Sequence, residues 1–333
     1  MPDIGIVVGG RMEAIGDLAR RAEDVGYESV WVAETASSAF VQASLACRAT
    51  SRVKIGTNIA LAFPRSPTIT AMAVRDLSEL SGGRFILGLG SQVKRINEHR
   101  FSVPFEHPAP KMTEYVEVVR KVLATFHGEP IDHRGRFYTV TMPPFPGADP
   151  APEVPIYLAA VNERMAEAAG RVADGILGHP MTSPKYIADV VRPAVERGAG
   201  AAGRDISAVS FTNSVILQIG EDRERARREA ALQVGFYATT RTYTPVLAHH
   251  GFDDRVAPLR RAYAGRNMEA LVDLALPMVD TFAIAGPEEE CRERLTAFDG
   301  LVDRIVFGGA WVGPQDSVAE NYRRLVETFR PLG

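Results

Sequence analysis

Glu34 and Thr35 stand directly after the apolar run Trp31-Val32-Ala33, where an acid and a hydroxyl could act on a bound molecule. A carboxylate at the end of a buried strand can accept a hydrogen bond from a ligand or relay a proton. It can equally cap a helix or face water as an ordinary loop residue. A threonine hydroxyl forms hydrogen bonds but is no base at neutral pH, so Glu34 is the stronger candidate for proton transfer.

Asn58 lies inside the apolar run Lys54–Leu61, where a polar amide is unusual. A buried amide must find hydrogen-bond partners. One interpretation is a bulge at Asn58 and Ile59 that turns backbone groups toward a cofactor, because bulges and strained peptides concentrate at active sites. The other is an asparagine whose side chain is bonded inside the core.

The segment Ser81–Gln92 ends a helix, continues as a short apolar strand and finishes in small polar residues. Its two leading glycines can adopt the positive φ that closes a helix. The run Phe85–Leu89 is typical of a strand covered on both faces, and Ser91 and Gln92 then offer donors to a ligand. The motif Gly88-x-Gly90 lacks the third glycine of a dinucleotide fold, so that fingerprint fails.

A further polar segment, Ala159–Arg164, leads directly into the predicted helix Met165–Val172. The start of a helix presents unpaired N–H groups and the positive end of its dipole, which together suit a phosphate. The small Ala160 permits close approach of a ligand, and Arg164 could add charge. Asn162 could instead simply cap the helix, because every strand–helix unit has such a terminus.

His179 follows the predicted strand Gly175–Leu177 and is the only histidine at a predicted strand end. Histidine titrates near neutrality and could donate or accept a proton. A hydrogen-bonded loop histidine is the plain alternative. No group of histidines and acids has the spacing of metal ligands, and no metal site is predicted.

The composition excludes several classes of partner. The 333 residues are 46% hydrophobic and 24% charged, enough to bury a large core, and the net charge of −3 gives no field that attracts nucleic acid or an anionic membrane. Cys47 and Cys291 form no metal or redox pair. The first residues lack a signal peptide and no apolar run reaches membrane length. We therefore expect a cytoplasmic protein that acts on a small molecule.

Apolar strand-like runs alternate with helix-period segments along most of the chain, which favours parallel βα units. Apolar residues recur at helical spacing between Ile15 and Val25, and Gly26 ends that helix. This pattern predicts an α/β fold, a (β/α)8 TIM barrel forming one domain over residues 1–333, with an open doubly wound sheet as the alternative. The eight expected strands are Ile4–Val8, Ser29–Ala33, Lys54–Leu61, Phe85–Leu89, Ile156–Ala159, Gly175–Leu177, Val209–Leu217 and Arg304–Phe307.

Three insertions interrupt the alternation, at about residues 93–110, 128–155 and 231–285. The first follows the fourth predicted strand, the second precedes the fifth and the third follows the seventh. Long connections of this kind often carry binding or assembly roles. The second insertion contains a predicted hairpin, Ile131–Tyr138, with its turn at Arg134-Gly135. The third is predicted to be helical, and its aromatic residues are expected to line a pocket roof or an oligomer contact: Tyr237, Tyr243, Phe252 and Tyr263.

Four segments resemble the luciferase-like monooxygenase superfamily in order and spacing, and in particular its branch that uses the deazaflavin coenzyme F420 and includes methylenetetrahydromethanopterin reductases. They are Ala22–Glu34, Lys54–Thr57, Leu80–Ser91 and Glu167–Gly175. The resemblance covers nearly the whole chain and implies a barrel that binds a flavin or deazaflavin at its C-terminal mouth. It also implies a homodimer.

The resemblance implies a role for each polar segment. Glu34 would lie beside the cofactor ring, and Asn58-Ile59 would form a bulge that in relatives often contains a non-proline cis peptide. Ser91 and Gln92 would bond the ring or its polyol. The phosphate would be held by Val161, Asn162, Glu163 and Arg164, next to Ala160. The implied reaction is hydride transfer between C5 of the deazaflavin and an organic substrate.

Two departures limit what the resemblance implies. Deazaflavin-dependent sugar-phosphate dehydrogenases have a histidine and a glutamate where this chain has Thr35 and Val93. Their acid–base groups are therefore missing, and Glu34 and His179 are left as candidates to handle protons. Two alternatives stay open: an FMN-dependent monooxygenase fed by a separate reductase, and a non-catalytic flavin-binding protein.

Overall fold

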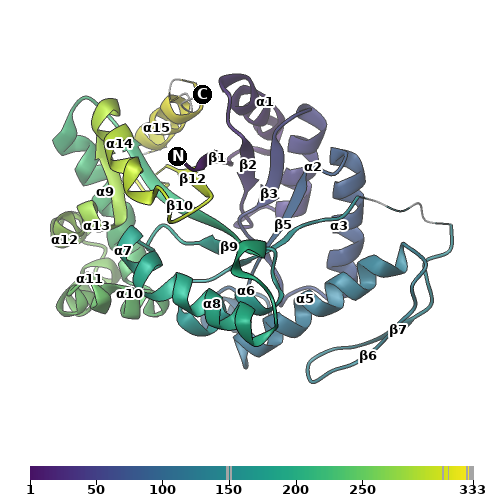
Figure 1. The fold of residues 1–333 in the computed structure, drawn as a ribbon. Coiled ribbons are helices and arrows are strands. Elements are labelled where there is room, and N and C mark those ends of the chain that lie inside the picture. Colours follow the sequence, from purple (N-terminus) through teal and green to yellow (C-terminus); the bar gives the residue numbers. More distant parts are fainter. Residues whose placement is uncertain (148–149, 151, 310, 314, 328, 330–333) are drawn as a thin grey trace.

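The computed structural model describes residues 1–147, 150, 152–309, 311–313, 315–327 and 329. Eight parallel strands pair in a closed ring with helices around it (Figure 1). The predicted (β/α)8 TIM barrel is confirmed, and the open sheet is excluded because the strands Ser210–Ile219 and Gly175–Gly178 pair with each other and close the ring. The ring consists of β1 (Asp3–Val8), β2 (Ser29–Val32), β3 (Lys54–Thr57), β5 (Phe85–Gly90), β8 (Ile156–Ala159), β9 (Gly175–Gly178), β10 (Ser210–Ile219) and β12 (Arg304–Gly308).

Helices cover the outside of the ring, and their ends follow the sequence signals. The first helix ends at Gly26, which adopts a φ of 103°. Pro67 is the first residue of the helix Pro67–Ser81. The hydroxyl of the N-cap residue Ser66 accepts the N–H of Ile69 at 3.2 Å. These helices are α1 (Ile15–Val25), α2 (Ala39–Ala49), α3 (Pro67–Ser81), α5 (Pro108–Thr125), α6 (Glu163–Val172), α7 (Pro184–Tyr186), α8 (Arg192–Ala201), α14 (Glu288–Leu295) and α15 (Gln315–Glu327).

One large side chain, that of Trp31, fills the centre of the barrel. It is fully buried and packs in an interior cluster with Ile86, Tyr157, Leu177 and Val306. A Cβ atom on Gly56 would lie 2.3 Å from the Trp31 ring, so a glycine is required there.

The third strand is interrupted where the sequence predicted one continuous run from Lys54 to Leu61. β3 ends at Thr57, the Asn58–Ile59 peptide is cis, and the chain resumes as β4 (Ala60–Leu61), which pairs with β5. The Asn58 side chain donates from Nδ2 to Ser214 Oγ on β10 at 2.9 Å. The backbone breaks at Asn58, and its amide is bonded across the barrel. That the break turns backbone groups toward a cofactor stays a prediction.

The hairpin before β8 forms, but its turn differs from the prediction. β6 (Ile131–Arg134) pairs with β7 (Thr139–Met142), so the loop comprises residues 135–138 rather than Arg134-Gly135. The Glu114 carboxylate on α5 accepts the N–H groups of this loop, including that of Tyr138 at 2.7 Å. Burial alone would raise the pKa of Glu114, but these N–H groups and His133 hold it below its usual value. Residues 148, 149 and 151 of this insertion lie outside the described residues.

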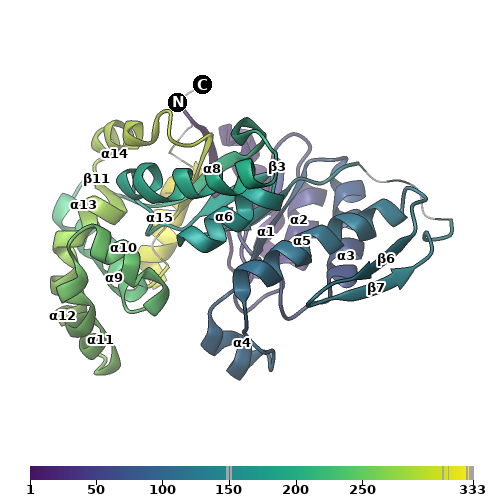
Figure 2. The ribbon, with the colours of Figure 1, turned by 60° about the horizontal axis from the view of Figure 1, so that its bottom comes forward.

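The other insertions are helical and lie around the C-terminal face of the barrel. α4 (Lys94–Arg100) follows β5 and projects from the barrel in Figure 2. The third insertion begins within α9 (Arg223–Ala238) and adds β11 (Ala283–Gly286), a strand that the sequence did not predict and that pairs with β10. Its other helices gather opposite the hairpin in Figures 1 and 2: α10 (Thr244–His249), α11 (Val256–Ala264), α12 (Met268–Ala275) and α13 (Val279–Phe282).

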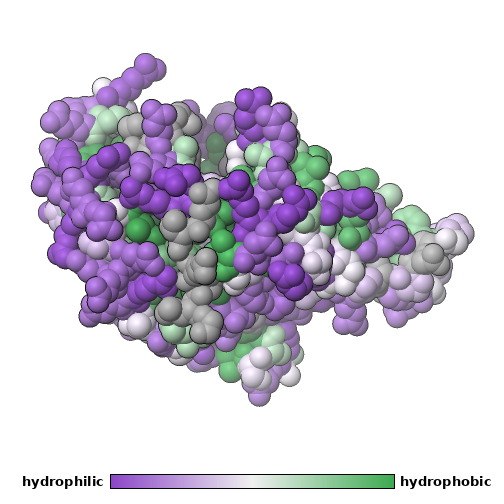
Figure 3. Space-filling model, turned by 90° about the horizontal axis from the view of Figure 1, so that it is seen from above, coloured by the Kyte–Doolittle hydropathy of each residue, from purple (hydrophilic) through white to green (hydrophobic). Residues whose placement is uncertain are grey.

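The outer surface is mostly polar. The face in Figure 3 is largely hydrophilic, with hydrophobic residues in separate patches. None of the helices in the described part of the chain combines the length and apolar character needed to cross a membrane.

The close approach of β3 and β5 generates a stability prediction. A Cβ atom on Gly88 would lie 1.8 Å from the Thr57 carbonyl oxygen, a backbone atom that cannot move without disturbing the ring. We expect Gly88→Ala to lower the free energy of unfolding by about 1–3 kcal/mol or more, measured by urea denaturation. Gly200→Ala is the control, because that glycine is exposed on α8 with open space around it and should gain up to about 1 kcal/mol. Equal stability of the two variants would contradict the prediction.

Candidate functional site

The C-terminal mouth of the barrel has a floor of half-exposed apolar side chains. Val7, Ile59 and Ala159 pack on the interior cluster around Trp31 from above. Gly90 leaves room for one of them, since a Cβ atom there would lie 2.0 Å from Ile59 Cδ1. In barrels of this kind ligands bind at the carboxyl ends of the strands, so this floor faces the expected site.

The Glu34 carboxylate is already bonded within the protein. It accepts the N–H of Leu61 at 2.8 Å and forms a two-pronged ion pair with the Arg65 guanidinium, whose Nη1 lies 2.7 Å from Oε2. Only 9% of the Glu34 side chain is exposed. Thr35, the next residue, is exposed. Arg65 could not be predicted as the partner of Glu34, because the pair joins the ends of two different strands.

A large cavity of about 1040 Å³ opens beside the ends of β5 and β8 and runs between α5 and α6. Five of the predicted site residues line it: Ser91, Gln92, Val161, Asn162 and Arg164. The other predicted residues lie outside its lining. Ala160 is buried, Glu163 is exposed at the first position of α6, and Glu34, Thr35, Asn58, Ile59 and His179 belong to the mouth.

The loop after β5 has a fixed shape on the cavity wall. Gln92 adopts a positive φ of 57°, and its Oε1 atom accepts the N–H of Val93 at 2.9 Å. The buried Asn97 of α4 holds the loop by donating from Nδ2 to the Ser91 carbonyl at 2.8 Å. Sequence reasoning missed Asn97, which lies in an otherwise charged helix and carries no motif.

The first turn of α6 leaves groups free to hold an anion. The N–H groups of Met165 and Ala166 are bonded to the Asn162 carbonyl, whereas no acceptor is described for those of Glu163 and Arg164. Asn162 is the N-cap residue, yet its side chain makes no capping bond; Nδ2 donates to the Thr242 carbonyl at 3.2 Å and the buried Oδ1 has no described partner. Of the two interpretations of this helix start, this geometry favours a phosphate site over a simple helix cap.

His179 is inward-facing at the end of β9 and is enclosed by two tyrosines. Its ring stacks on Tyr243 at 4.4 Å and meets the edge of Tyr237 at 4.5 Å. The Nδ1 atom accepts the N–H of Met181 at 3.2 Å, so the proton of the neutral ring sits on Nε2. Burial lowers the pKa of His179 to about 3. The ring is therefore a neutral donor, not a group that gains and loses a proton near pH 7.

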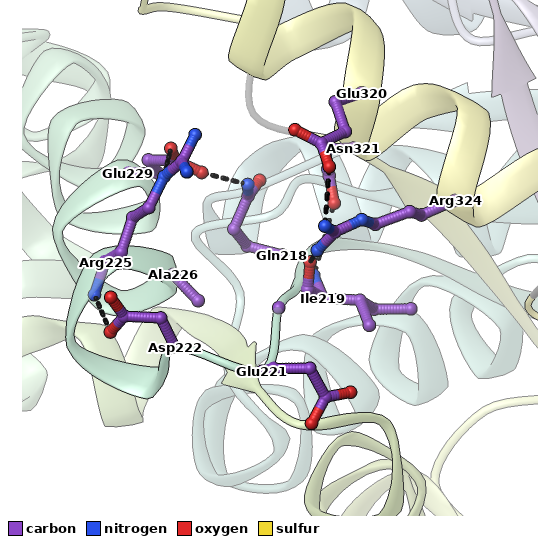
Figure 4. Close-up of a pocket in the computed structure, with 11 residues that line it drawn as sticks. Gln218, Ile219, Glu221, Asp222, Arg225, Ala226, Glu229, Glu320, Asn321 and Arg324 are labelled. Atoms are coloured by element: carbon purple, nitrogen blue, oxygen red, sulfur yellow. Dashed lines mark hydrogen bonds and ion pairs between the residues drawn. The ribbon is translucent and has the colours of Figure 1, made fainter.

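A smaller cavity of about 120 Å³ lies near the end of β10, between α9 and α15 (Figure 4). Its charged groups are largely paired with one another: Arg225 with Glu229, and Arg324 with Glu320. Gln218 donates to Glu229 there. None of the predicted site residues lines this cavity, so the larger one is the candidate ligand site.

The chain matches one family model and is similar in sequence to several known proteins. The model of the family described as luciferase-like monooxygenase matches residues 3–304. An uncharacterized protein of Mycobacterium tuberculosis is 40% identical over 299 residues, covering 87% of this chain and 88% of that protein. A 5,10-methylenetetrahydromethanopterin reductase of Methanolobus tindarius is 30% identical over 313 residues, covering 92% of each.

Solved structures share the fold at lower identity. A coenzyme F420-dependent tetrahydromethanopterin reductase from Methanopyrus kandleri aligns with a TM-score of 0.78 at 23% identity, covering 97% of both chains. A type II Baeyer–Villiger monooxygenase from Pseudomonas putida, in complex with FMN, aligns with a TM-score of 0.68 at 16% identity, covering 99% of this chain and 98% of the other.

The buried neutral His179 predicts a pH dependence of stability. Its folded-state pKa of about 3 lies below the value of roughly 6.5 for an unfolded histidine. Between these values the unfolded chain binds a proton that the folded chain does not, so the stabilisation is complete above about pH 6.5 and is lost as the pH falls toward 3. The free energy of unfolding of the wild type should therefore decline more steeply from pH 6.5 to 4 than that of His179→Gln. The exposed His99→Gln is the control and should keep the wild-type slope; identical slopes in all three would contradict the prediction.

Proposed function

The chain belongs to the luciferase-like monooxygenase family and is an oxidoreductase, and from that membership we propose that it transfers a hydride between coenzyme F420 and a small organic substrate. The observation that carries the proposal is the cavity of about 1040 Å³ that joins the strand ends to the start of α6. Its volume and its position would suit a cofactor whose ring lies at the barrel mouth and whose phosphate lies at the start of α6.

The residues present fit such a cofactor. The free N–H groups of Glu163 and Arg164 and the dipole of α6 favour a phosphate, and the exposed Arg164 side chain adds charge. The buried Oδ1 of Asn162 lacks a described donor and can accept a hydrogen bond from a ligand hydroxyl. Ser91 and Gln92 would bond the polar groups between the ring and the phosphate.

The protein would supply orientation and water exclusion, while a bound deazaflavin would supply hydride chemistry at C5. Ile59 and Ala159 offer an apolar surface for a flat ring. The ion pair of Glu34 with Arg65 holds the break between β3 and β4 in place, which favours a positioning role for Glu34 over proton relay.

FMN is the second candidate cofactor, because a structure with the same fold holds it. Fluorescence and absorbance titrations of the apoprotein with F420 and with FMN, each oxidised and reduced, separate the two. Tight FMN binding with oxygen-dependent turnover and no F420 binding would overturn the proposal. Tight cofactor binding with no hydride exchange in a metabolite screen would instead support a non-catalytic flavin-binding protein.

The expected homodimer is part of the proposal. α2 and α3 pack side by side and expose large apolar side chains, and a patch of this kind favours a protein contact. These side chains are Val41, Leu45, Ile69, Met72 and Leu80. We expect the double variant Leu45→Glu and Ile69→Glu to sediment as a monomer and the wild type as a dimer; a monomeric wild type would contradict this.

The phosphate site predicts the effect of two substitutions on cofactor affinity. Asn162→Asp places a negative charge beside the phosphate and Arg164→Ala removes a positive one, so each should raise the Kd for F420 about tenfold, or roughly 1.4 kcal/mol. Fluorescence titration measures this. Arg20→Ala on α1 is the control, because Arg20 is exposed and bonded to Asp17 far from the cavity. Unchanged affinity in both site variants would remove α6 from the phosphate site.

A further inference from the structure

Side chains alternate between the two faces of a strand, and this alternation determines which of them face into the barrel at the mouth. Leu177 on β9 lies in the barrel interior, so His179, two residues on, faces the same way one level higher. On the neighbouring strand, Thr212 registers with Leu177 and Asn213 with Gly178. The register therefore brings Ser214 of β10 beside His179.

The position of His179 is fixed from several sides. Its carbonyl oxygen accepts both the N–H and the hydroxyl of Thr182, at 2.8 and 2.6 Å, while Nδ1 is bound by Met181. The Asn213 side chain packs so closely over Gly178 that a Cβ atom on this glycine would lie 1.8 Å from Asn213 Oδ1. Within the described residues Nε2–H has no acceptor, so a fixed donor faces the mouth.

Ser214 offers a second donor at the same level. Its Oγ atom accepts Nδ2 of Asn58 at 2.9 Å, and no acceptor is described for its own hydroxyl hydrogen. Two neighbouring donors match an oxygen with two lone pairs, as a carbonyl group has.

The surroundings of this pair of donors are uncharged. The described contacts of His179, Tyr237 and Tyr243 are with rings, a backbone amide and the neutral side chains of Trp311 and Gln233. Burial raises the pKa of both tyrosines above the usual value, and it lowers the pKa of His179. A charged ligand would lose its hydration here without gaining a counter-ion.

We propose that His179 Nε2–H and Ser214 Oγ–H form an oxygen-binding subsite for an uncharged carbonyl compound, or the corresponding alcohol. This rests on the proposed hydride transfer. In the reducing direction the carbonyl carbon gains the hydride, the C=O π pair becomes a lone pair on oxygen, and a proton from water completes the alcohol while the coenzyme loses two electrons. Both donors then stabilise the negative charge that develops on the oxygen.

The direct test follows the imidazole of His179 by ¹⁵N NMR in the full chain, with and without F420. Cyclohexanone is the uncharged carbonyl probe, and cyclohexanecarboxylate is the anionic probe of similar shape. We expect the Nε2–H resonance to shift on addition of cyclohexanone and to stay in place with the carboxylate. No shift with cyclohexanone in either state would overturn the proposal, as would an equal response to the anion.

Variants test the two donors separately. His179→Phe keeps a ring between the tyrosines but removes the donor, and we expect it to raise the Kd for cyclohexanone about tenfold, the loss of one hydrogen bond. Ser214→Ala should raise that Kd by a similar factor; an unchanged Kd would remove Ser214 from the subsite. Methylenecyclohexane has the shape of the ketone without its acceptor and should bind wild type and His179→Phe equally. His127→Phe, in the exposed turn after α5, is the control and should bind the ketone as the wild type does.

The two proposals fail in different ways. If the protein does not bind F420 but the His179 resonance still responds to cyclohexanone, the subsite stands and the cofactor assignment falls. If F420 binds and exchanges hydride while that resonance does not respond, the subsite falls and the proposed function stands.

Discussion

The Trp31 side chain fills the space inside the barrel. The position of its ring along the barrel axis determines the depth at which the open mouth begins. The ring fits because the facing positions on neighbouring strands carry no side chain: Cβ atoms on Gly5 and Gly56 would lie 2.9 and 2.3 Å from Trp31 atoms. Ile59 and Ala159 rest on this plug and close the interior from above. A smaller residue at position 31 would leave a cavity beneath the floor, so the floor depends on a side chain that never meets a ligand.

The break in the third strand is held from both sides of the mouth. On one side the Asn58 N–H donates to the Val32 carbonyl at 2.8 Å, and the Glu34 N–H donates to the Ile59 carbonyl at 3.0 Å. The Glu34 carboxylate then binds Leu61 and Arg65 beyond the break. On the other side, the Asn58 amide reaches across to Ser214. Asn58, whose neighbour Ile59 is part of the floor, thus connects the floor to β10, the strand that carries Ser214, one of the two proposed substrate donors.

The parts of this architecture that depend on local sequence could be predicted, and the parts that depend on distant contacts could not. The approximate strand positions and the end of α1 at Gly26 follow from periodicity and from residues with particular backbone preferences. The helix α6 was predicted from Met165 but begins two residues earlier, at Glu163. The hairpin turn was misplaced because its loop is shaped by Glu114, a residue of α5 that is about twenty positions away. Arg65 and Ser214 were missed for the same reason, because their partners Glu34 and Asn58 lie on other elements. Asn97 was missed because no motif marks it, although its partner Ser91 is only six residues away. The position of the cis peptide was expected only from the resemblance to a family.

Charge is divided between the two halves of the site in a way that matches two different ligands. The cavity beside α6 is lined by charged residues of both signs: Lys94, Arg164 and Arg171, and Glu114, Glu117 and Glu167. The part of the mouth around His179 and Ser214 contains neutral donors and apolar surface, while the Glu34 carboxylate is paired with Arg65. An anionic cofactor would be recognised through charge and helix dipole, which act strongly on a phosphate. A neutral substrate would be selected through shape and two directed hydrogen bonds, because a site without counter-ions rejects charged competitors by their cost of desolvation. On the two proposals, this separation would let one chain bind both molecules without the charge of the cofactor deciding which substrates enter.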